Sequence, residues 1–145
     1  MKIIYFGSTE DSIYTLDVLK QNNFEIFTIF TKNSKSMRRG RETSLTSIEN
    51  YASEHKINIK KPRSLKSDND LIAYFSKIKP DIFVVSSYGI IIPKEILEIP
   101  KYGVINIHPS LLPKYKGLNT HRRVLENNET KTGCTVHYVN QEMDG

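Results

Sequence analysis

Asn106 and His108 are the residues best suited to chemistry, because they lie two positions apart at the end of an apolar run. Side chains two positions apart on an extended strand point to the same face. A carboxamide donates a neutral hydrogen bond and a protonated imidazole donates a charged one, so the pair is suited to stabilising an oxyanion. The alternative is a polar strand end whose side chains are satisfied by the following loop.

Asp144 is a candidate partner for this pair. A carboxylate near His108 would fix the tautomer of the imidazole and position a water for proton transfer. An aspartate that precedes a glycine, as Asp144 precedes Gly145, is by itself only a turn residue. The other histidines lack the spacing of metal ligands, so we expect no metal and interpret them as structural or surface residues: His55, His121 and His137.

Short apolar runs alternate with segments of helical spacing along the whole chain. The β-branched and aromatic runs predict strands. Residues that cap or start helices precede the segments between them. We predict strands over residues 2–6, 24–30, 57–59, 82–85, 103–108 and 133–139. We predict helices capped by Asp11 or Ser12, by Ser44 or Thr46 and by Thr120, a helix over residues 68–78, and a short helix that begins at Pro93.

This alternation predicts an α/β fold, Rossmann-like, with a mainly parallel sheet, right-handed crossovers and helices on both faces. Ligands of such sheets bind beyond the carboxyl ends of the strands. Polar clusters follow three of the predicted strands, and they are the candidate binding segments: Gly7-Ser8-Thr9, Ser86-Ser87-Tyr88-Gly89, and Asn106 with His108.

The chain is basic, with 21 Lys and Arg residues against 16 Asp and Glu residues and a formal net charge of +5. The excess is concentrated in a segment without acidic residues, which we predict to be a loop. Such a loop suits the phosphates of a nucleotide or an RNA, and the alternatives are a solvated surface or a nonspecific nucleic-acid binder. The cations of this loop are Lys32, Lys35, Arg38, Arg39 and Arg41.

A length of 145 residues corresponds to one domain. The single cysteine, Cys134, excludes an internal disulfide and a thiolate zinc cage. The apolar run near Met1 is too short for a signal peptide or a membrane span, so we expect a cytoplasmic protein without a membrane partner.

Residues 106–117, with the sequence Asn-Ile-His-Pro-Ser-Leu-Leu-Pro-Lys-Tyr-Lys-Gly, resemble the signature of the folate-dependent formyltransferases. An Asp-Gly pair, Asp144-Gly145, follows about one strand later, as in that family. The resemblance covers essentially the whole chain and is strongest over residues 86–145. It implies a formyltransferase catalytic domain over residues 1–145, which in the family continues past the Asp-Gly pair with another strand and a helix.

The resemblance also implies an activity and a role for individual residues. The family transfers a formyl group from 10-formyltetrahydrofolate to an amine and needs no metal. Asn106 and His108 would stabilise the tetrahedral intermediate, and Asp144 would support His108 and assist proton movement. The implied folate-binding residues are Ser87, Tyr88, Gly89, Ile90, Ile92, Gln141 and Glu142, and the implied acceptor-binding residues are Gly7, Ser8, Thr9, Arg38, Arg39, Arg41, Ser110, Leu111, Leu112 and Pro113.

The acceptor amine stays open among three classes. The first turn, the basic loop and residues 87–93 resemble family members that act on initiator methionyl-tRNA. Residues 117–123 and 133–137 resemble members that act on glycinamide ribonucleotide. Glu10 and Asp11, however, would repel a substrate phosphate near the first turn. Members that formylate nucleotide-linked sugars share the same signature, and a folate-binding module without turnover is a further alternative.

Overall fold

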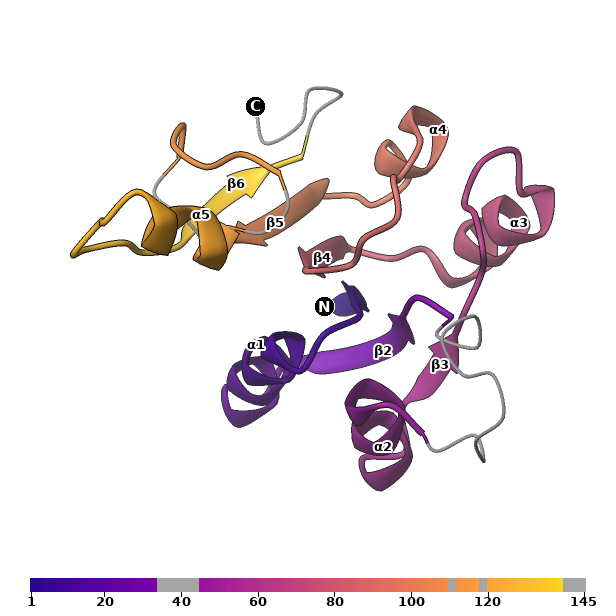
Figure 1. Cartoon of the computed structure of the whole chain (residues 1–145). Helices are drawn as coiled ribbons and strands as arrows, with labels where there is room; N and C mark the ends of the chain where they lie inside the picture. The colour runs from indigo at the N-terminus through magenta and orange to yellow at the C-terminus, as the bar shows by residue number, and fades with distance from the viewer. Residues whose placement is uncertain (34–44, 110–111, 118–119, 140–145) are drawn as a thin grey trace, which may run out of the picture.

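The computed structural model describes residues 1–33, 45–109, 112–117 and 120–139. In these residues a sheet with the strand order β3-β2-β1-β4-β5-β6 lies between helices (Figure 1). The first five strands of that order are parallel, and β6 runs antiparallel to β5. This arrangement confirms the predicted α/β fold with a mainly parallel sheet. The elements are β1 (Lys2–Gly7), α1 (Asp11–Gln21), β2 (Glu25–Phe30), α2 (Ser47–Glu54), β3 (Asn58–Lys60), α3 (Asn69–Ile78), β4 (Ile82–Ser86), α4 (Lys94–Leu97), β5 (Val104–His108), α5 (Thr120–Glu126) and β6 (Thr135–Tyr138).

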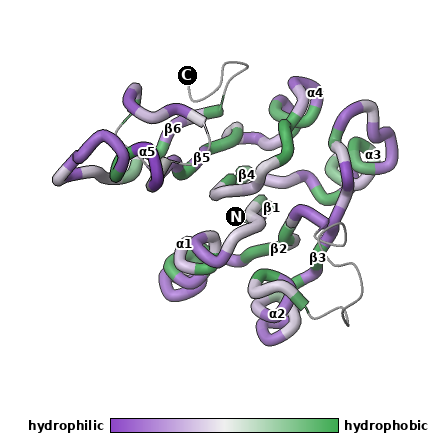
Figure 2. Tube along the Cα trace, in the orientation of Figure 1, coloured by the Kyte–Doolittle hydropathy of each residue, from purple (hydrophilic) through white to green (hydrophobic). Residues whose placement is uncertain are grey.

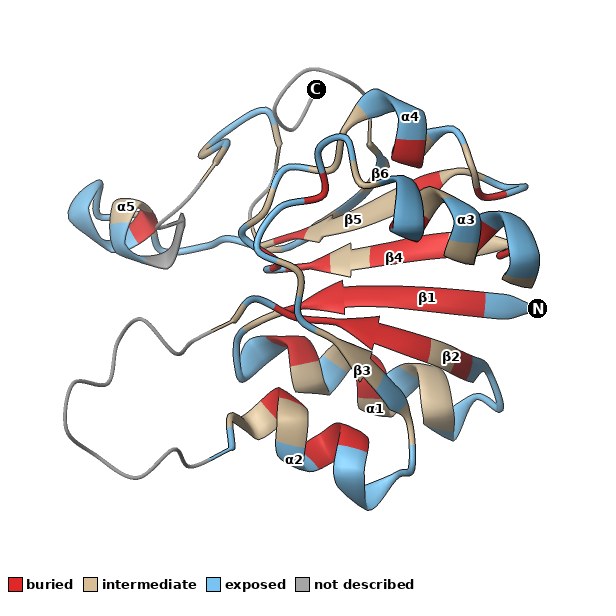
Figure 3. Ribbon diagram, turned by 90° about the vertical axis from the view of Figure 1, so that its right-hand side faces the viewer, coloured by how far each residue is buried: buried red, intermediate tan, exposed pale blue. Residues whose placement is uncertain are grey.

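The central strands are apolar on both faces, because helices cover both sides of the sheet (Figure 3). Ile4 and Phe6 of β1 pack toward α3 and α4, whereas Ile3 and Tyr5 pack toward α1 and α2. Hydrophobic residues therefore follow the central strands, and hydrophilic residues line the outer sides of the helices (Figure 2). Burial on both faces explains why the strand signals in the sequence are continuous apolar runs.

An aromatic cluster fills the layer between the sheet and α3. Phe6 stacks on Phe30 with ring centroids 4.8 Å apart, and Phe83 lies 5.0 Å from Phe6. Tyr88 meets Phe6 edge to face at 5.2 Å. The Tyr88 side chain is buried, and its hydroxyl has no hydrogen-bond partner among the described residues. A buried hydroxyl without a partner costs free energy.

Two buried tyrosines are expected to respond in opposite ways when the hydroxyl is removed. Tyr88→Phe is expected to leave the free energy of unfolding unchanged or raise it by up to about 1 kcal/mol. Tyr5→Phe is expected to lower it by about 1 kcal/mol, because the Tyr5 hydroxyl donates to the Ser12 carbonyl at 2.7 Å. Urea denaturation of both variants measures the difference. Equal losses in the two variants would contradict the assignment of an unsatisfied hydroxyl to Tyr88.

The helix starts follow the sequence prediction in part. Thr46 caps α2 by accepting from the Glu49 amide, and Asp68 caps α3 by accepting from the Leu71 amide. The predicted cap of α1 at Asp11 or Ser12 is wrong. The N-cap of α1 is Glu10, which makes no side-chain cap. Ser12 is instead buried, and its hydroxyl donates to the Ser86 carbonyl at 2.6 Å.

Candidate active site

The carboxyl ends of β1, β4 and β5 lie side by side. Gly7 is in register with Ser86, and Val85 is in register with Asn106. Because these strands are parallel, the segments that follow them meet at one edge of the sheet. The structure thereby brings together the described parts of the three polar clusters that the sequence indicated.

Ser8 connects three of the chain segments at this edge. Its hydroxyl donates to the Tyr88 carbonyl at 2.6 Å and accepts from the Lys32 amide at 2.9 Å. Its own amide donates to the Ser87 carbonyl at 3.0 Å. Ser8 therefore fixes the ends of β1, β2 and β4 relative to one another, which is a positioning task. Thr9, next to it, is exposed.

The segment after β4 is a tight turn in which Ser87 and Gly89 are exposed. Ser87 and Gly89 both have left-handed backbone conformations, with φ of 53° and 84°. The ring of Tyr88, between them, is turned into the core. Ile90 and Ile92 pack partly buried against the same core cluster. The Tyr88 carbonyl accepts from the Ser8 hydroxyl and the residue is buried, so Tyr88 has a structural task.

Asn106 and His108 point to the same face of β5, and each has a defined partner. The Nδ2 atom of Asn106 lies 3.3 Å from Nε2 of His137, the residue directly opposite on β6. The Nε2 atom of His108 lies 2.7 Å from the Tyr115 carbonyl oxygen. A carbonyl only accepts hydrogen bonds, so His108 carries a proton on Nε2. In the neutral ring the lone pair is then on Nδ1, and in the protonated ring Nδ1 is a donor as well.

The loop that holds His108 is itself anchored. The Tyr115 hydroxyl donates to Oε1 of Glu129 at 2.9 Å, and Lys114 reaches the same oxygen at 3.2 Å. The Arg123 guanidinium lies 5.5 Å from the centroid of the Tyr115 ring. These contacts fix the carbonyl that orients His108. Two predicted acceptor-binding residues, Leu112 and Pro113, belong to this loop, and the Leu112 amide donates to Thr135 Oγ1 at 3.0 Å.

Glu129→Ala is expected to loosen this loop with little effect on global stability, because the contacts of Glu129 are near the surface. The hydrogen bond from Tyr115 lowers the pKa of the Glu129 carboxyl, with a further contribution from Lys114. A lowered pKa in the folded state means that the contact stabilises the loop above the ordinary carboxyl pKa and is lost as the pH falls through the lowered value.

The measurement for Glu129→Ala is the exchange rate of the His108 Nε2 proton by nuclear magnetic resonance, which is expected to increase severalfold. Glu126→Ala is the matched control. It removes the exposed ion pair between Arg122 and Glu126 on α5, in which Nε and Oε1 lie 2.7 Å apart. An equal change in the two variants would show that the Glu129 contacts do not hold His108.

The profile of the formyl transferase family matches residues 1–145. The chain belongs to the formyl transferase family. A relative named methionyl-tRNA formyltransferase, from Alkaliphilus oremlandii, is 40% identical over 144 residues, which are 99% of this chain and 46% of the relative. A relative of the same name from Anaplasma marginale is 37% identical over 146 residues, which are 99% of this chain and 48% of the relative. The chain spans about half the length of these curated relatives.

Solved structures share the formyl transferase fold. A phosphoribosylglycinamide formyltransferase from Bacillus halodurans matches with a TM-score of 0.77 and 20% identity, covering 100% of this chain and 75% of that protein. A sugar N-formyltransferase from a Shewanella species matches with a TM-score of 0.66 and 19% identity, covering 99% of this chain and 53% of that protein. At these identities the likeness concerns the fold alone.

Several candidate residues of this formyl transferase domain lie outside the described residues: Lys35, Arg38, Arg39, Arg41, Ser110, Leu111, Gln141, Glu142 and Asp144. The structure adds one residue that the sequence analysis interpreted as structural or at the surface, namely His137, which contacts Asn106. The signal that could have found it is its position two residues after Thr135 on the last strand, the same spacing as in the Asn106-His108 pair.

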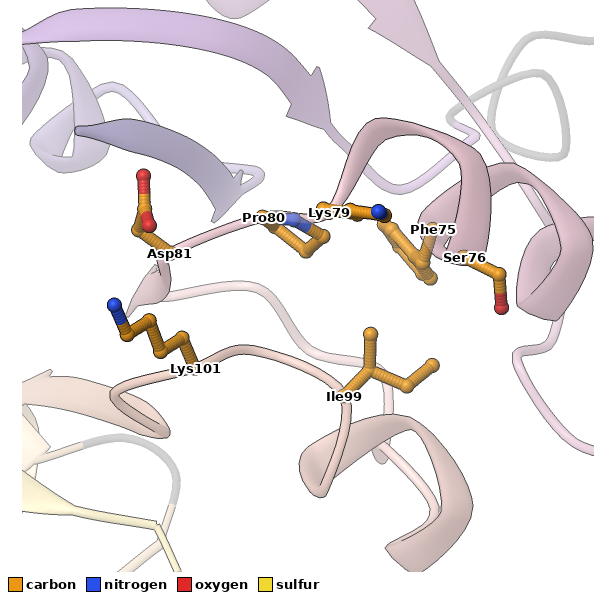
Figure 4. Close-up of a pocket in the computed structure, with 7 residues that line it drawn as sticks. All are labelled: Phe75, Ser76, Lys79, Pro80, Asp81, Ile99 and Lys101. Atoms are coloured by element: carbon orange, nitrogen blue, oxygen red, sulfur yellow. The ribbon is translucent and has the colours of Figure 1, made fainter.

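A hollow of about 530 Å³ lies away from these residues, between the connections that lead into β4 and β5 (Figure 4). Lys79, Asp81 and Lys101 line it. It opens at the amino ends of the strands, opposite to the edge that carries Asn106 and His108, so we do not assign the reaction to it. Within the described residues, the structure contains no group of three or more His, Cys, Asp or Glu side chains placed to hold a metal. No helix in those residues is long and apolar enough to span a membrane.

Proposed function

We propose that this domain transfers a formyl group from 10-formyltetrahydrofolate to an amine, with Asn106 and His108 as the catalytic residues. The observation that carries the proposal is the Asn106-His108 pair on one face at the carboxyl end of β5, in a member of the formyl transferase family. Asn106 donates a neutral hydrogen bond, and protonated His108 donates from Nδ1 while its Nε2 proton remains on the Tyr115 carbonyl. Both donors stabilise the negative charge that develops on the formyl oxygen as the amine attacks.

The turn after β4 is the segment that we propose to contribute to binding the folate ring system. Ser87 and Gly89 are exposed at this turn, and Ile90 and Ile92 supply apolar surface beside them. Such sites combine an apolar lining with a few placed polar groups. We assign Asp144 the role of supporting the positive charge of protonated His108 and accepting the proton that the amine must lose, in line with the family resemblance of residues 106–117.

For the acceptor we propose initiator methionyl-tRNA. Relatives with that activity in their name are 37% and 40% identical along almost the whole chain. Exposed cations also follow β2 and β3 at the same edge of the sheet, namely Lys32 after β2 and Arg63 after β3. Lys61, also after β3, is paired with Glu49 at 3.5 Å. β3 is four strands from β5, which is about 19 Å at roughly 4.8 Å per strand. Cations at that distance suit the phosphates of an extended nucleic acid better than those of a mononucleotide.

The test measures transfer from radiolabelled 10-formyltetrahydrofolate to methionyl-tRNA, glycinamide ribonucleotide and an amino-sugar nucleotide. We expect the highest kcat/KM with methionyl-tRNA. A higher value with either other acceptor overturns the tRNA assignment. Calorimetric titration with a stable formyl-folate analogue, run in parallel, separates binding from turnover. Saturable binding without transfer to any acceptor would identify a folate-binding module and overturn the proposed activity of this chain.

A further inference from the structure

The polar face at the end of β5 continues onto β6. Asn106 lies directly opposite His137, and His108 lies directly opposite Thr135. Residues opposite each other in an antiparallel pair point to the same face of the sheet. Both β6 residues contact the site, because His137 lies against the Asn106 amide at 3.3 Å and Thr135 accepts from the Leu112 amide at 3.0 Å. Val136 and Tyr138 alternate with them and are exposed on the other face.

The contacts of His137 define its tautomer. Its Nδ1 atom lies 3.1 Å from the Tyr138 carbonyl oxygen. The carbonyl only accepts, so Nδ1 carries a proton, and in the neutral ring Nε2 carries the lone pair. The Asn106 atom beside that lone pair is Nδ2, which only donates. The hydrogen bond therefore runs from the amide of Asn106 to the imidazole of His137.

This hydrogen bond selects one of the two orientations of the Asn106 amide. The end that faces His137 must be the nitrogen, because the amide oxygen there would meet the lone pair of Nε2. An amide nitrogen carries two N–H groups. When one of them is held by His137, the orientation of the other is fixed with it. In a site that stabilises an oxyanion, a preorganised donor contributes more than one that must turn during the reaction.

We propose that His137 is a positioning residue that sets the donor end of Asn106 for the formyl oxygen. The inference rests on the proposed formyl transfer and adds a specific role to β6. His137 acts through Asn106 and does not touch the reacting atoms. The role depends on the acceptor at Nε2, so a side chain that places an oxygen there retains it and an apolar side chain of similar size loses it.

The kinetic test is a double-mutant cycle. His137→Leu is expected to lower kcat about tenfold, which corresponds to about 1.4 kcal/mol, with the KM for the formyl donor within about twofold. His137→Gln places an amide oxygen near the position of Nε2 and is expected to restore kcat to within about threefold. In an Asn106→Ala background, His137→Leu is expected to have no further effect.

Equal effects of His137→Leu in the two backgrounds, or full activity of His137→Leu, would overturn the role. Val136→Ala, on the opposite face of the same strand, is the matched control.

A second measurement does not depend on turnover. Long-range proton–nitrogen spectra of the wild-type chain report which ring nitrogen of His137 is protonated. A proton on Nδ1 is expected, together with a shift of the Asn106 side-chain amide signals in His137→Leu but not in Val136→Ala. A proton on Nε2, with or without one on Nδ1, would overturn the inference, whether or not the chain transfers formyl groups. Absence of transfer with the expected tautomer would instead count against the proposed function.

Discussion

Exchange of His108 for alanine is expected to lower kcat for formyl transfer by about 100- to 1,000-fold, the range observed when one oxyanion donor is removed. The KM for the formyl donor is expected to change little, because the charge that His108 stabilises develops only in the transition state. Single-turnover kinetics with saturating donor measures the chemical step directly. His55→Ala, which removes an exposed imidazole at the end of α2, is the control and is expected to retain activity.

A second variant separates catalysis from folding, because His108 is only 5% exposed and its loss leaves a gap. Glutamine at this position can donate its side-chain N–H to the Tyr115 carbonyl, as Nε2 of His108 does, but it has no ionisable ring. His108→Gln is expected to fold with a Tm close to that of the wild type and to lose activity nearly as strongly as His108→Ala. A fully active His108→Gln would show that the imidazole is not the charged donor.

Gly7→Ala is expected to lower the free energy of unfolding by about 1–3 kcal/mol, the range typical of an overpacked core. A Cβ atom at Gly7 would lie 2.7 Å from Cβ of Ser12 and 2.9 Å from Cε1 of Tyr5. Neither neighbour can retreat easily, because the hydroxyl of each is hydrogen-bonded at 2.6 Å or 2.7 Å. Urea denaturation measures the loss, and Thr9→Ala, two residues further along the same turn, is the control.

The double variant Gly7→Ala/Ser12→Gly removes the nearest obstacle to the new methyl group. The free energy of unfolding of the double variant is expected to be higher than the value obtained by adding the losses of the two single variants. The reason is that the two side chains compete for one space. Strict additivity of the two losses would place the strain of Gly7→Ala elsewhere.

Much of the fold could be predicted from local patterns. Strands buried on both faces are continuous apolar runs, and the starts of α2 and α3 are marked by Thr46 and Asp68, whose side chains cap them. The capping residue of α1 was mispredicted because Ser12, a good capping residue, donates to the Ser86 carbonyl on β4 instead. A tertiary hydrogen bond to a distant strand leaves no trace in the local sequence.

The candidate site was predictable where one strand carries it and not where two strands meet. The spacing of Asn106 and His108 on one strand predicted their common face. The contact between Asn106 and His137 depends on the antiparallel register of β5 and β6, which connects residues 31 positions apart. The polar turn around Tyr88 suggested that this residue contacts a ligand. Packing against Phe6 instead turns its ring into the core. Register and side-chain direction arise from packing, so sequence motifs alone do not determine them.

The central place of β1 in the sheet has a consequence for biosynthesis. β1 pairs with β2 on one side and with β4 on the other, where Ile4 aligns with Phe83. Ribosomes add about 5–20 residues per second, so roughly 4–16 s separate the synthesis of these two partners. During that interval the edge of β1 that later pairs with β4 has no partner in the nascent polypeptide. This edge can pair with strands of other chains. Factors that shield emerging chains would therefore matter most for this protein before β4 has left the ribosome.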